Sequence, residues 1–479
     1  MEGARGSTVV YFLSLHALMK GSVNMKQQVK NNKITEGVIW KQLLIFFFPI
    51  LFGTFFQMLY NTIDAIVVGR VVGKEALSAV GGITNTLINL LIGFFVGISS
   101  GATVSISQYY GAKNDEEVSK AVHTSIALAI VGGAAIMVIG IVGAPYALRL
   151  MGTPEDIYPY SLTFLRLYFC GTIANLIYNM GAGILRAVGD SKRPLIFLIL
   201  SCFVNIFLDI LFVVGFRWSV AGVALGTVIA QIVSALLVCI TLMRAKDSYQ
   251  LHIRKIRFHK EMLKKIVRIG LPAGFQSLMY TSTNVIIQTN MNHFGTNTIA
   301  AWTAYSKVDG IFWMTMGAFG IAATTFAGQN YGAGRYDRVR RGAIVSLRMA
   351  LSVAVVMSLL LYFGAPYVYV WFTKDPVVIV KGMEIIHFMV PGFILYVCIE
   401  ILSGTLRGMG NSLVPMIMTS LGVCALRIIW LIVVVPIFPD IRTVMFSYPL
   451  AWGATSLMFI IYYRRYAKKH LAANPYRSL

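Results

Sequence analysis

Long apolar runs dominate this chain and set the kind of fold that it can adopt. Runs of about 20 residues with few charges recur along almost its whole length, and each is long enough to cross a bilayer as a helix. Only 13% of the residues are charged, whereas a soluble protein of this size carries about 25%. We therefore predict an all-α integral membrane protein with twelve transmembrane helices, over residues 40–69, 76–108, 120–147, 158–185, 194–216, 220–243, 267–292, 297–327, 342–365, 381–405, 413–437 and 444–463.

The basic residues are distributed unevenly between the two sets of predicted loops. One set includes the segment 244–268, the cluster 335–341 and the tail from Arg464, whereas the other holds few Lys and Arg residues. Because short cytoplasmic loops are enriched in Lys and Arg, we predict cytoplasmic termini and a multi-pass protein of the inner (plasma) membrane. The net charge of +22 then reflects topology and a basic face beside anionic lipid, and we expect no nucleic-acid partner.

An internal repeat organises the rest of the chain. SQYYGAKNDEEV (107–118) returns as GQNYGAGRYDRV (328–339), and LRAVGDSKRP (185–194) returns as LRGMGNSLVP (406–415), both at an offset of 221 residues. Each repeat holds six predicted spans, so the two halves share one orientation and form two pseudo-symmetric lobes, related by an axis along the membrane normal.

The repeat also sets the predicted domain boundaries. We expect residues 1–24 to be an upstream extension before a natural start at Met25, because they fit neither a clean signal peptide nor the repeat. The predicted segments are a cytoplasmic tail (1–36), a first lobe (37–245), a basic cytoplasmic linker (246–266), a second lobe (267–467) and a cytoplasmic C-terminal tail (468–479).

The duplicated motifs lie at the predicted cytoplasmic ends of the spans. Gln108 and Gln329 come near the ends of the second and eighth spans, and the glycine three residues later can terminate each helix. We interpret these motifs as turns and as contacts that latch the inner face, and we assign them no substrate role.

Polar residues inside the first lobe suggest a more specific site. Asp64 and Asp209 both lie in apolar spans, where a carboxylate costs roughly 2.5–3.5 kcal/mol. Asn205 precedes Asp209 by four residues and shares its helix face. Carboxylate, amide and hydroxyl oxygens are the ligands that a hard cation prefers, and Asn179 and Thr227 add an amide and a hydroxyl group to the set. Without a metal ion, two close carboxylates could instead share a proton. The pattern therefore leaves Na⁺ and H⁺ open.

The second lobe does not repeat these acids, because Ile287 stands at the position that matches Asp64 and Trp430 at the one that matches Asp209. Leu426 stands at the position that matches Asn205. Its own polar residues define a candidate cavity lined by Gln276, Asn284, Lys307, Asp309 and Glu400. Lys307 and Asp309 are two residues apart and do not face each other on one helix. We expect them to belong to a charge network between helices, for instance with Glu400 or Arg427, and we favour this role over direct contact with the substrate.

These features together resemble the multidrug and toxic compound extrusion (MATE) family over residues 37–467. The resemblance depends on the six-plus-six repeat, Pro49 followed by NTIDAIVVGR (61–70), NIFLD (205–209), and the LRAVGD and LRGMGN turns. It implies export of amphipathic, often cationic, organic compounds in exchange for Na⁺ or H⁺ by alternating access.

The chain is most similar to the branch of that family whose first lobe carries the cation site. The resemblance implies cation-linked roles, with possible Na⁺ binding, for Asp64, Asn205, Asp209 and Thr227. It further implies a supporting role for Asn179 and a hinge at Pro49, with Tyr60 and Asn61 nearby.

Other function classes fit the sequence less well. A flippase for lipid-linked precursors or polysaccharides, from the same wider superfamily, remains the main alternative. An enzyme is not expected, because we find no nucleophile–base or metal-ligand motif, and a channel is not expected, because no filter-like run occurs. We expect a monomer that contacts small organic substrates and the lipid bilayer, with no cofactor other than the coupling ion.

Overall fold

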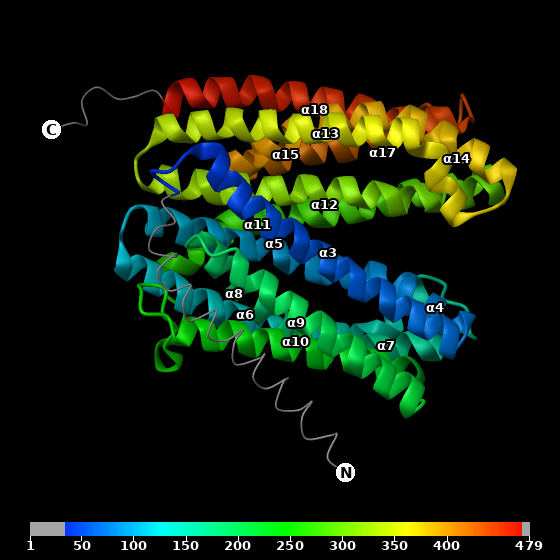
Figure 1. The fold of residues 1–479 in the computed structure, drawn as a ribbon, viewed down its shortest axis with the longest axis horizontal. Helices are drawn as coiled ribbons and strands as arrows, with labels where there is room; N and C mark the ends of the chain where they lie inside the picture. Colours follow the sequence, from blue (N-terminus) through cyan, green and yellow to red (C-terminus); the bar gives the residue numbers. More distant parts are fainter. Residues whose placement is uncertain (1–33, 472–479) are drawn as a thin grey trace, which may run out of the picture.

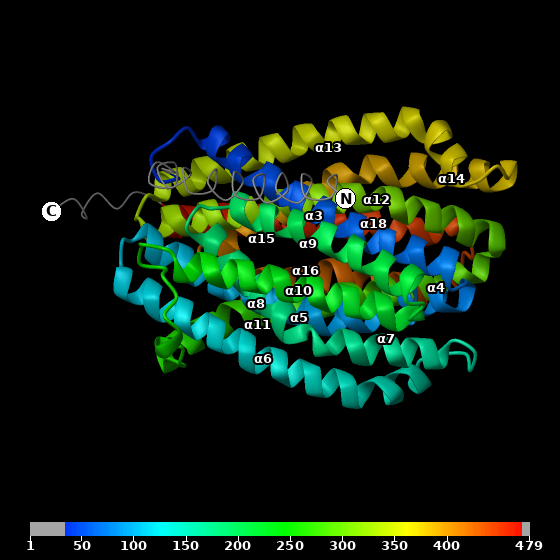
Figure 2. The same ribbon diagram turned by 60° about the horizontal axis from the view of Figure 1, so that its bottom comes forward.

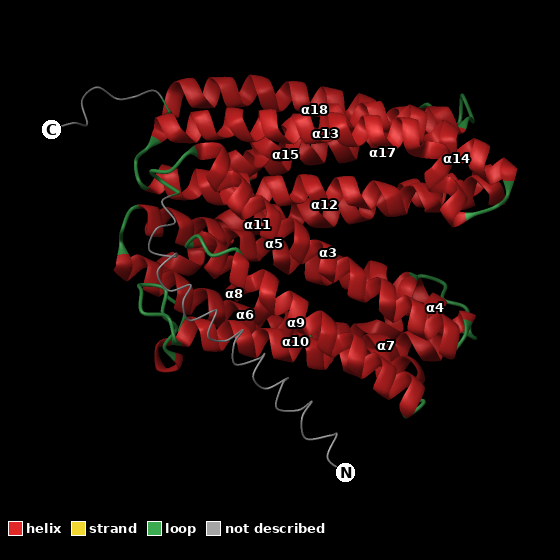
Figure 3. Cartoon of the chain, viewed as in Figure 1, coloured by secondary structure: helices red, strands yellow, loops and turns green. Residues whose placement is uncertain are grey.

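The computed structural model describes residues 34–471, which fold into helices joined by short loops, with no strand in this range (Figure 3). The predicted extension 1–24 lies outside the described residues. The first lobe comprises α3 (Ile39–Val71), α4 (Lys74–Gly81), α5 (Ile83–Gly111), α6 (Asp115–Leu150), α7 (Tyr158–Cys170), α8 (Thr172–Ala187), α9 (Lys192–Asp209), the π-helix η1 (Ile210–Gly215) and α10 (Ser219–Met243).

A loop with the 3₁₀ turn η2 (Ile253–Lys255) leads to the second lobe, whose first helix begins within the predicted linker. This lobe comprises α11 (Lys260–Met291), η3 (Asn292–Phe294), α12 (Thr296–Gly332), α13 (Tyr336–Phe372), α14 (Pro376–Met389), η4 (Val390–Gly392), α15 (Phe393–Gly408), α16 (Leu413–Thr419), the π-helix η5 (Ser420–Ala425), α17 (Leu426–Val433) and α18 (Ile441–His470). Where helices follow one another directly they form one pass, and the predicted spans all coincide with such passes.

Ten of these passes are long and apolar enough to cross a membrane by length and composition alone. The other two are α7 with α8, and α11, which contain more polar residues: α7 carries Arg166, and α11 begins with the charged segment 260–268. Both run in line with the remaining helices (Figures 1 and 2). The predicted fold class, an all-α membrane protein with two repeated lobes, is confirmed.

The two lobes lie side by side with their helices along a common direction, and α3 crosses obliquely between them (Figure 1). The loops 112–114, 244–259 and 333–335 gather at one end of the bundle, near the start of α3. We call this the basic end, because these loops carry many of the Lys and Arg residues counted above.

The first helix of each lobe belongs to two cores. Near the basic end, α3 contributes Leu43 and Phe47 to the core of the second lobe, and Phe47 stacks on Phe319 of α12 with ring centroids 4.0 Å apart. Val68, near the other end of α3, packs in the core of the first lobe. The same exchange occurs in α11, whose Met262 and Ile266 pack in the first lobe while Ile287 and Met291 pack in the second. The two helices therefore tie each lobe to the other.

Close backbone contact joins α5 to α11 across the lobe boundary. Gly97 and Gly101 on α5 face Gly274 and Gly270 on α11, and a Cβ built at Gly97 would lie 2.5 Å from the Gly274 Cα atom. Glycines four residues apart form a stripe along one helix face, which lets membrane helices approach to backbone contact. No larger residue fits at this crossing without moving the helices apart.

Two glutamine side chains cross the lobe boundary at the basic end. Gln108 Nε2 of α5 donates to the Gly408 carbonyl oxygen at the end of α15 (2.9 Å), and Gln329 Nε2 of α12 donates to the Ala187 carbonyl oxygen at the end of α8 (2.6 Å). Donor and acceptor positions are both related by the repeat offset of 221 residues. We call these two reciprocal hydrogen bonds the glutamine latches.

The helix ends explain why the glutamines find free acceptors. After α8, the amide of Asp190 donates to the Leu185 carbonyl and that of Gly189 to the Arg186 carbonyl, which is a Schellman ending with Gly189 at a φ of +107°. This pattern leaves the Ala187 carbonyl for a partner from outside the helix, which Gln329 supplies. The interpretation of the motifs as turns and latches is confirmed.

The glycines of the same motifs have a different role from the one expected. Gly111 and Gly332 are the last residues of their helices, but the left-handed residues that follow are Lys113 (φ +56°) and Gly334 (φ +71°). A Cβ at Gly111 would instead collide with the backbone of Gln329, and one at Gly332 would collide with the backbone of Gln108. These glycines are therefore required for close approach of the two lobes.

Candidate functional site

The two acids of the first lobe meet between α3 and α9. Asp64 lies on α3, two turns before its end, and Asp209 is the last residue of α9. Both side chains are buried, with exposed fractions of 6% and 0%. Their carboxyl groups are close enough to interact electrostatically, although the residues are far apart in sequence. The predicted convergence of these two residues is thus present in the described structure.

Amide and hydroxyl groups complete this cluster. Asn205 Nδ2 donates to Asp209 Oδ1 (3.5 Å), and Thr227 Oγ1 on α10 donates to Asp64 Oδ2 (3.4 Å). The absence of a side chain at Gly226 makes room, because a Cβ there would collide with Asp209 Oδ1. Three helices therefore position four polar side chains around one point.

Several oxygens in this cluster have no hydrogen-bond partner. Asp64 Oδ1, Asn205 Oδ1 and Asp209 Oδ2 are all buried and unpaired. The great majority of buried polar atoms in proteins have a hydrogen-bond partner, so three unpaired acceptors in one place need an explanation. All three are acceptors, so a bound cation with oxygen ligands would pair with them, and a proton shared between the carboxyls would pair with the two aspartate oxygens. The donor set fits either ion.

The remaining first-lobe residues lie around this cluster to different degrees. Tyr60 precedes Asp64 by one helical turn and interacts with it electrostatically. Asn179 donates to the backbone oxygen and to Oδ1 of Asn175 on its own helix (2.9 and 3.0 Å), and no hydrogen bond joins it to the acids within residues 34–471. Asn61 is exposed, and Pro49 is partly buried inside α3.

A π-helical turn follows the site and was not expected from the sequence. α9 ends at Asp209, and η1 continues the same pass over Ile210–Gly215. Such turns are rare and occur frequently at functional sites. The second lobe has a π-helix too, η5, which ends two residues before Arg427. No residue pattern in either segment distinguishes it from the surrounding apolar helix.

The candidate residues of the second lobe do not form one cluster. Gln276 donates to Thr419 Oγ1 (3.2 Å), whereas Asn284 and Lys307 are exposed. Glu400 accepts a hydrogen bond from Tyr396 of the same helix (2.9 Å), and its Oε1 lies 3.9 Å from Arg407. Lys307 forms no ion pair with a described residue.

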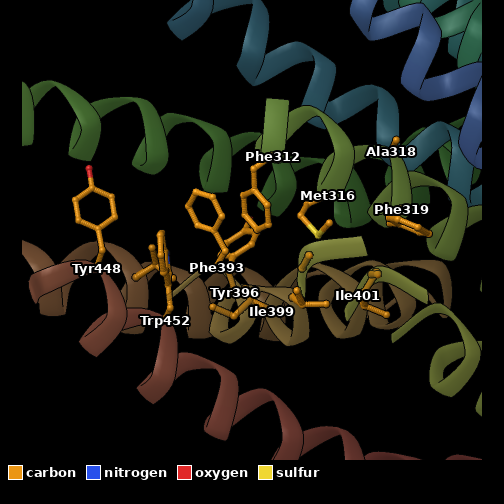
Figure 4. Packing of buried hydrophobic residues seen from close by; sticks show 14 of the residues in the cluster. Phe312, Met316, Ala318, Phe319, Phe393, Tyr396, Ile399, Ile401, Tyr448 and Trp452 are labelled. Atoms are coloured by element: carbon orange, nitrogen blue, oxygen red, sulfur yellow. The ribbon is translucent and has the colours of Figure 1, made fainter. Parts of the chain in front are cut away.

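Asp309 lies in an aromatic region of the second lobe. It accepts a hydrogen bond from Trp313 Nε1 (2.5 Å) and is close enough to Arg427 for an electrostatic interaction. Figure 4 shows the buried aromatic side chains nearby: Phe312 and Phe393 stack with centroids 4.0 Å apart, and Trp452 lies beside Tyr448. Of the expected charge network, the Asp309–Arg427 proximity is present.

Comparison with known families identifies the chain. A family model described as MatE matches residues 49–211 and 272–433, one stretch in each lobe. The chain belongs to the MatE family.

Similar proteins cover nearly the whole MatE chain. "Probable multidrug resistance protein YoeA" of Bacillus subtilis (strain 168) is 27% identical over 452 residues, which is 93% of this chain and 97% of that protein. "Probable multidrug resistance protein NorM" of Bacillus cereus (strain ATCC 10987 / NRS 248) is 26% identical over 386 residues, 79% of this chain and 84% of that protein. A solved structure of an outward-facing multidrug resistance MATE family transporter of the MOP superfamily matches with a TM-score of 0.86 at 21% identity, over 92% of this chain and 98% of that one, and supports the MatE fold.

Proposed function

We propose that this MatE protein is a multidrug efflux transporter that exports amphipathic, often cationic, compounds in exchange for Na⁺ or H⁺. Family membership and the names of its relatives support drug export, and they favour it over the flippase alternative and over enzyme activity. The main support for ion coupling is the pair Asp64 and Asp209. Both side chains are buried, and each has a carboxylate oxygen without a hydrogen-bond partner, in a chain with membrane-spanning helices.

In this proposal the basic end faces the cytoplasm, in the plasma membrane, with both termini inside. The glutamine latches hold the lobes together at that end, so the conformation described here is closed toward the cytoplasm. Substrate release would then occur at the opposite end, and loading would require the latches to break.

The acid pair couples the ion to this cycle through α3. Two adjacent carboxylates cannot easily both be charged at low dielectric, so a Na⁺ ion or a proton stabilises their proximity. Asp64 lies on α3 beyond Pro49, and a proline inside a helix removes a backbone hydrogen bond and allows bending there. Ion binding at Asp64 would pull the outer part of α3 toward α9 and reshape the path to the outside. Each charge moved across the full membrane potential supplies about 2.3 kcal/mol per 100 mV.

Efflux from reconstituted vesicles tests this mechanism and identifies the ion. Ethidium loaded into vesicles would be driven out by a pH gradient or a Na⁺ gradient, each imposed separately. We expect Asp64→Asn and Asp209→Asn each to abolish gradient-driven efflux, because neither variant can bind the ion as a charged pair.

The matched control is Glu400→Gln, which neutralises a partly buried acid of the second lobe with its own partners. Its efflux should fall much less at equal protein content. Wild-type efflux from both aspartate variants would show that the coupling site lies elsewhere.

A further inference from the structure

The loop that precedes α11 is held against α6 of the first lobe by two histidines that the proposed ion coupling does not use. His123 lies on α6 near the basic end and is buried, and His259 is the last residue before α11. His123 accepts a hydrogen bond from this loop, and the backbone of His259 donates to Thr124 of α6. We call residues 252–259 the histidine strap. Because the first residues of α11 also pack in the first lobe, the strap holds the start of α11 on that lobe.

The hydrogen bonds of His123 require its neutral form. Its Nδ1 lies 2.6 Å from the Ser119 carbonyl oxygen, which can only accept, so Nδ1 carries a hydrogen. Its Nε2 lies 3.0 Å from the backbone nitrogen of His252, which can only donate, so Nε2 carries none. A second proton on the ring would place two N–H groups opposite each other, and the hydrogen bond that holds the strap would be lost.

His259 is held in the neutral form as well. Arg257 Nε donates to its Nε2 (3.2 Å), so that nitrogen carries no hydrogen. Its Nδ1 lies 3.1 Å from Thr124 Oγ1, which also accepts from the His259 backbone nitrogen (3.3 Å). Partial burial, followed by the positive charges of Arg257 and Lys120, lowers the pKa of His259 below its ordinary value of 6.5, although Glu117 opposes this shift. The docked strap therefore disfavours a second proton on either ring.

The groups that face the His123 ring from the strap are basic. His252 stacks on it with ring centroids 6.1 Å apart. Lys255 and His259 are close enough to interact with it electrostatically. A positive charge on His123 would therefore meet further positive charge, and protonation of the neighbouring histidines would add to the repulsion.

The helices packed on α6 carry charges of their own near this end. Tyr109 of α5 lies under Lys265 of α11, whose Nζ is 3.8 Å from the ring centroid, and both interact with Glu117. Glu117 also pairs with Lys120 (2.9 Å). Arg186 of α8 interacts with a tyrosine of its own helix, and α7 packs on α6 farther from the basic end. The acid that faces the strap is thus shared with two lysines and compensates poorly for further positive charge.

The equivalent segment before α3 is held in a different way. At the repeat offset of 221, residues 34–37 correspond to residues 255–258, and they dock on the second lobe. Arg338 of α13 donates through Nη2 to the carbonyl oxygens of Ile34 (2.9 Å) and Gly37 (2.8 Å). We call residues 34–37 the arginine strap. Arginine remains charged throughout the physiological pH range, so this strap does not titrate.

We propose that the histidine strap is a pH-sensitive tether: acid at the basic end protonates His123 and His259 and releases residues 252–259 from α6, while the arginine strap stays docked. The start of α11 then loses its hold on the first lobe, and the start of α3 keeps its hold on the second. In the proposed orientation the tether responds to cytoplasmic pH. The side that it senses rests on the proposed function, whereas the release itself does not.

Hydrogen exchange of the purified full-length chain in detergent measures the release. Mass spectrometry would follow peptides that cover residues 250–259 and 34–44 at pH 7.5 and 5.5, with exchange times scaled to keep the chemical exchange equal. The backbone amides of His252 and His259 exchange when their hydrogen bonds open, so their protection follows the docked-to-released ratio.

The size of the effect follows from the pKa of the released histidines, which is about 6.5. Docking is strongest above this pH and weakens as the pH falls through it, because only the released strap binds the extra protons. At pH 5.5 each histidine lowers the docked-to-released ratio by about tenfold. Protection of the histidine strap should therefore fall by about ten- to a hundredfold between pH 7.5 and 5.5, and protection of residues 34–44 should not change.

Glutamine in place of either histidine supplies an acceptor that does not titrate. His123→Gln can place Oε1 where the ring accepts from His252, and His259→Gln can do the same for the arginine beside it. Each variant should keep its protection at pH 7.5 and lose about half of the fall on a logarithmic scale, and the double variant should show no fall. The matched control is His387→Gln on α14, at the opposite end of the bundle, where the strap should respond as in wild type (Figure 1).

Three results would overturn the proposal. The first is equal protection of the histidine strap at both pH values in wild type, and the second is a full fall in the double variant. The third is an equal fall in residues 34–44, because acid would then loosen the whole basic end. If His123→Gln does not fold, His259→Gln gives the same test alone, since His259 is only partly buried. Ethidium efflux is measured separately, so failure of the tether leaves the export function standing.

Discussion

Removing the glutamine latches should shift this transporter toward a state that is open at the basic end. Gln108→Ala and Gln329→Ala each delete one hydrogen bond that joins the lobes, and neither changes a residue of the proposed ion site. Each such bond contributes about 0.5–1.5 kcal/mol net. Together they favour contact of the lobes by about 1–3 kcal/mol, so the double variant should increase the open-to-closed ratio about 5- to 150-fold.

A single reporter cysteine measures this ratio. Ser107 is fully buried at the same end, beside Gly328 of the other lobe, so it becomes reachable from the basic side only when the lobes part. The five native cysteines would be replaced, Ser107→Cys introduced, and its reaction with a membrane-impermeant maleimide timed. While opening remains rare and fast, the labelling rate follows the open population. The double variant should react about 5- to 150-fold faster, and each single variant by roughly the square root of that factor.

The control removes the same kind of bond within one lobe. Gln250 Nε2 donates to the Met243 carbonyl oxygen at the end of α10 (3.0 Å), so Gln250→Ala deletes a glutamine cap without touching the boundary between the lobes. Its labelling rate should equal that of the parent. If the double latch variant also labels at the parent rate, or Gln250→Ala accelerates labelling equally, the latches do not set the equilibrium.

Further predictions concern topology, the start site and helix packing. A cysteine at Lys255 should react with an impermeant reagent from the cytoplasmic side and one at Lys374 from outside, and outside labelling at Lys255 would reverse the proposed orientation. A chain that begins at Met25 should insert and transport as the full chain does at equal expression; loss of transport would assign residues 1–24 a role. Gly101→Ala should lower the free energy of unfolding by about 1–3 kcal/mol, because its Cβ would collide with the α11 backbone, and the melting temperature in detergent should fall. A Cβ at Gly143 meets no atom within 4 Å, so Gly143→Ala should leave the melting temperature unchanged.

The helical passes and the meeting of Asp64 with Asp209 were predictable from the sequence, for two physical reasons. A bilayer requires about 20 apolar residues per pass, so each run indicates its own span. A buried acid is costly in a membrane, so two acids in one lobe predict that the two side chains meet at a common site. The same reasoning does not predict the contacts of Asn179, because its amide group donates to Asn175 on its own helix.

The partners of helices across the lobe boundary were not predictable in this way. In a membrane helix nearly every face is apolar, so periodicity does not tell a face that packs on the other lobe from one that faces lipid. Phe47 and Ile266 therefore gave no sign that they pack outside their own lobes. The surroundings of Arg427 were hidden for the same reason, because Tyr448 and Trp302 look like any other aromatic residues of a span.

The exchange of α3 and α11 between the two cores has a consequence for how the chain is made. Leu43 and Phe47 leave the ribosome early, but the α12 residue that Phe47 stacks on, Phe319, is synthesised more than 270 positions later. Until then this part of α3 can pack only on first-lobe partners such as Ser191, whose Oγ donates to the Ile45 carbonyl oxygen, and it lacks its contacts with the second lobe. A chain cut in the loop 244–259 would yield two halves that are each incomplete, and each carries the helix that the other lacks. Biogenesis is therefore an assembly reaction between halves, even though a single polypeptide carries both.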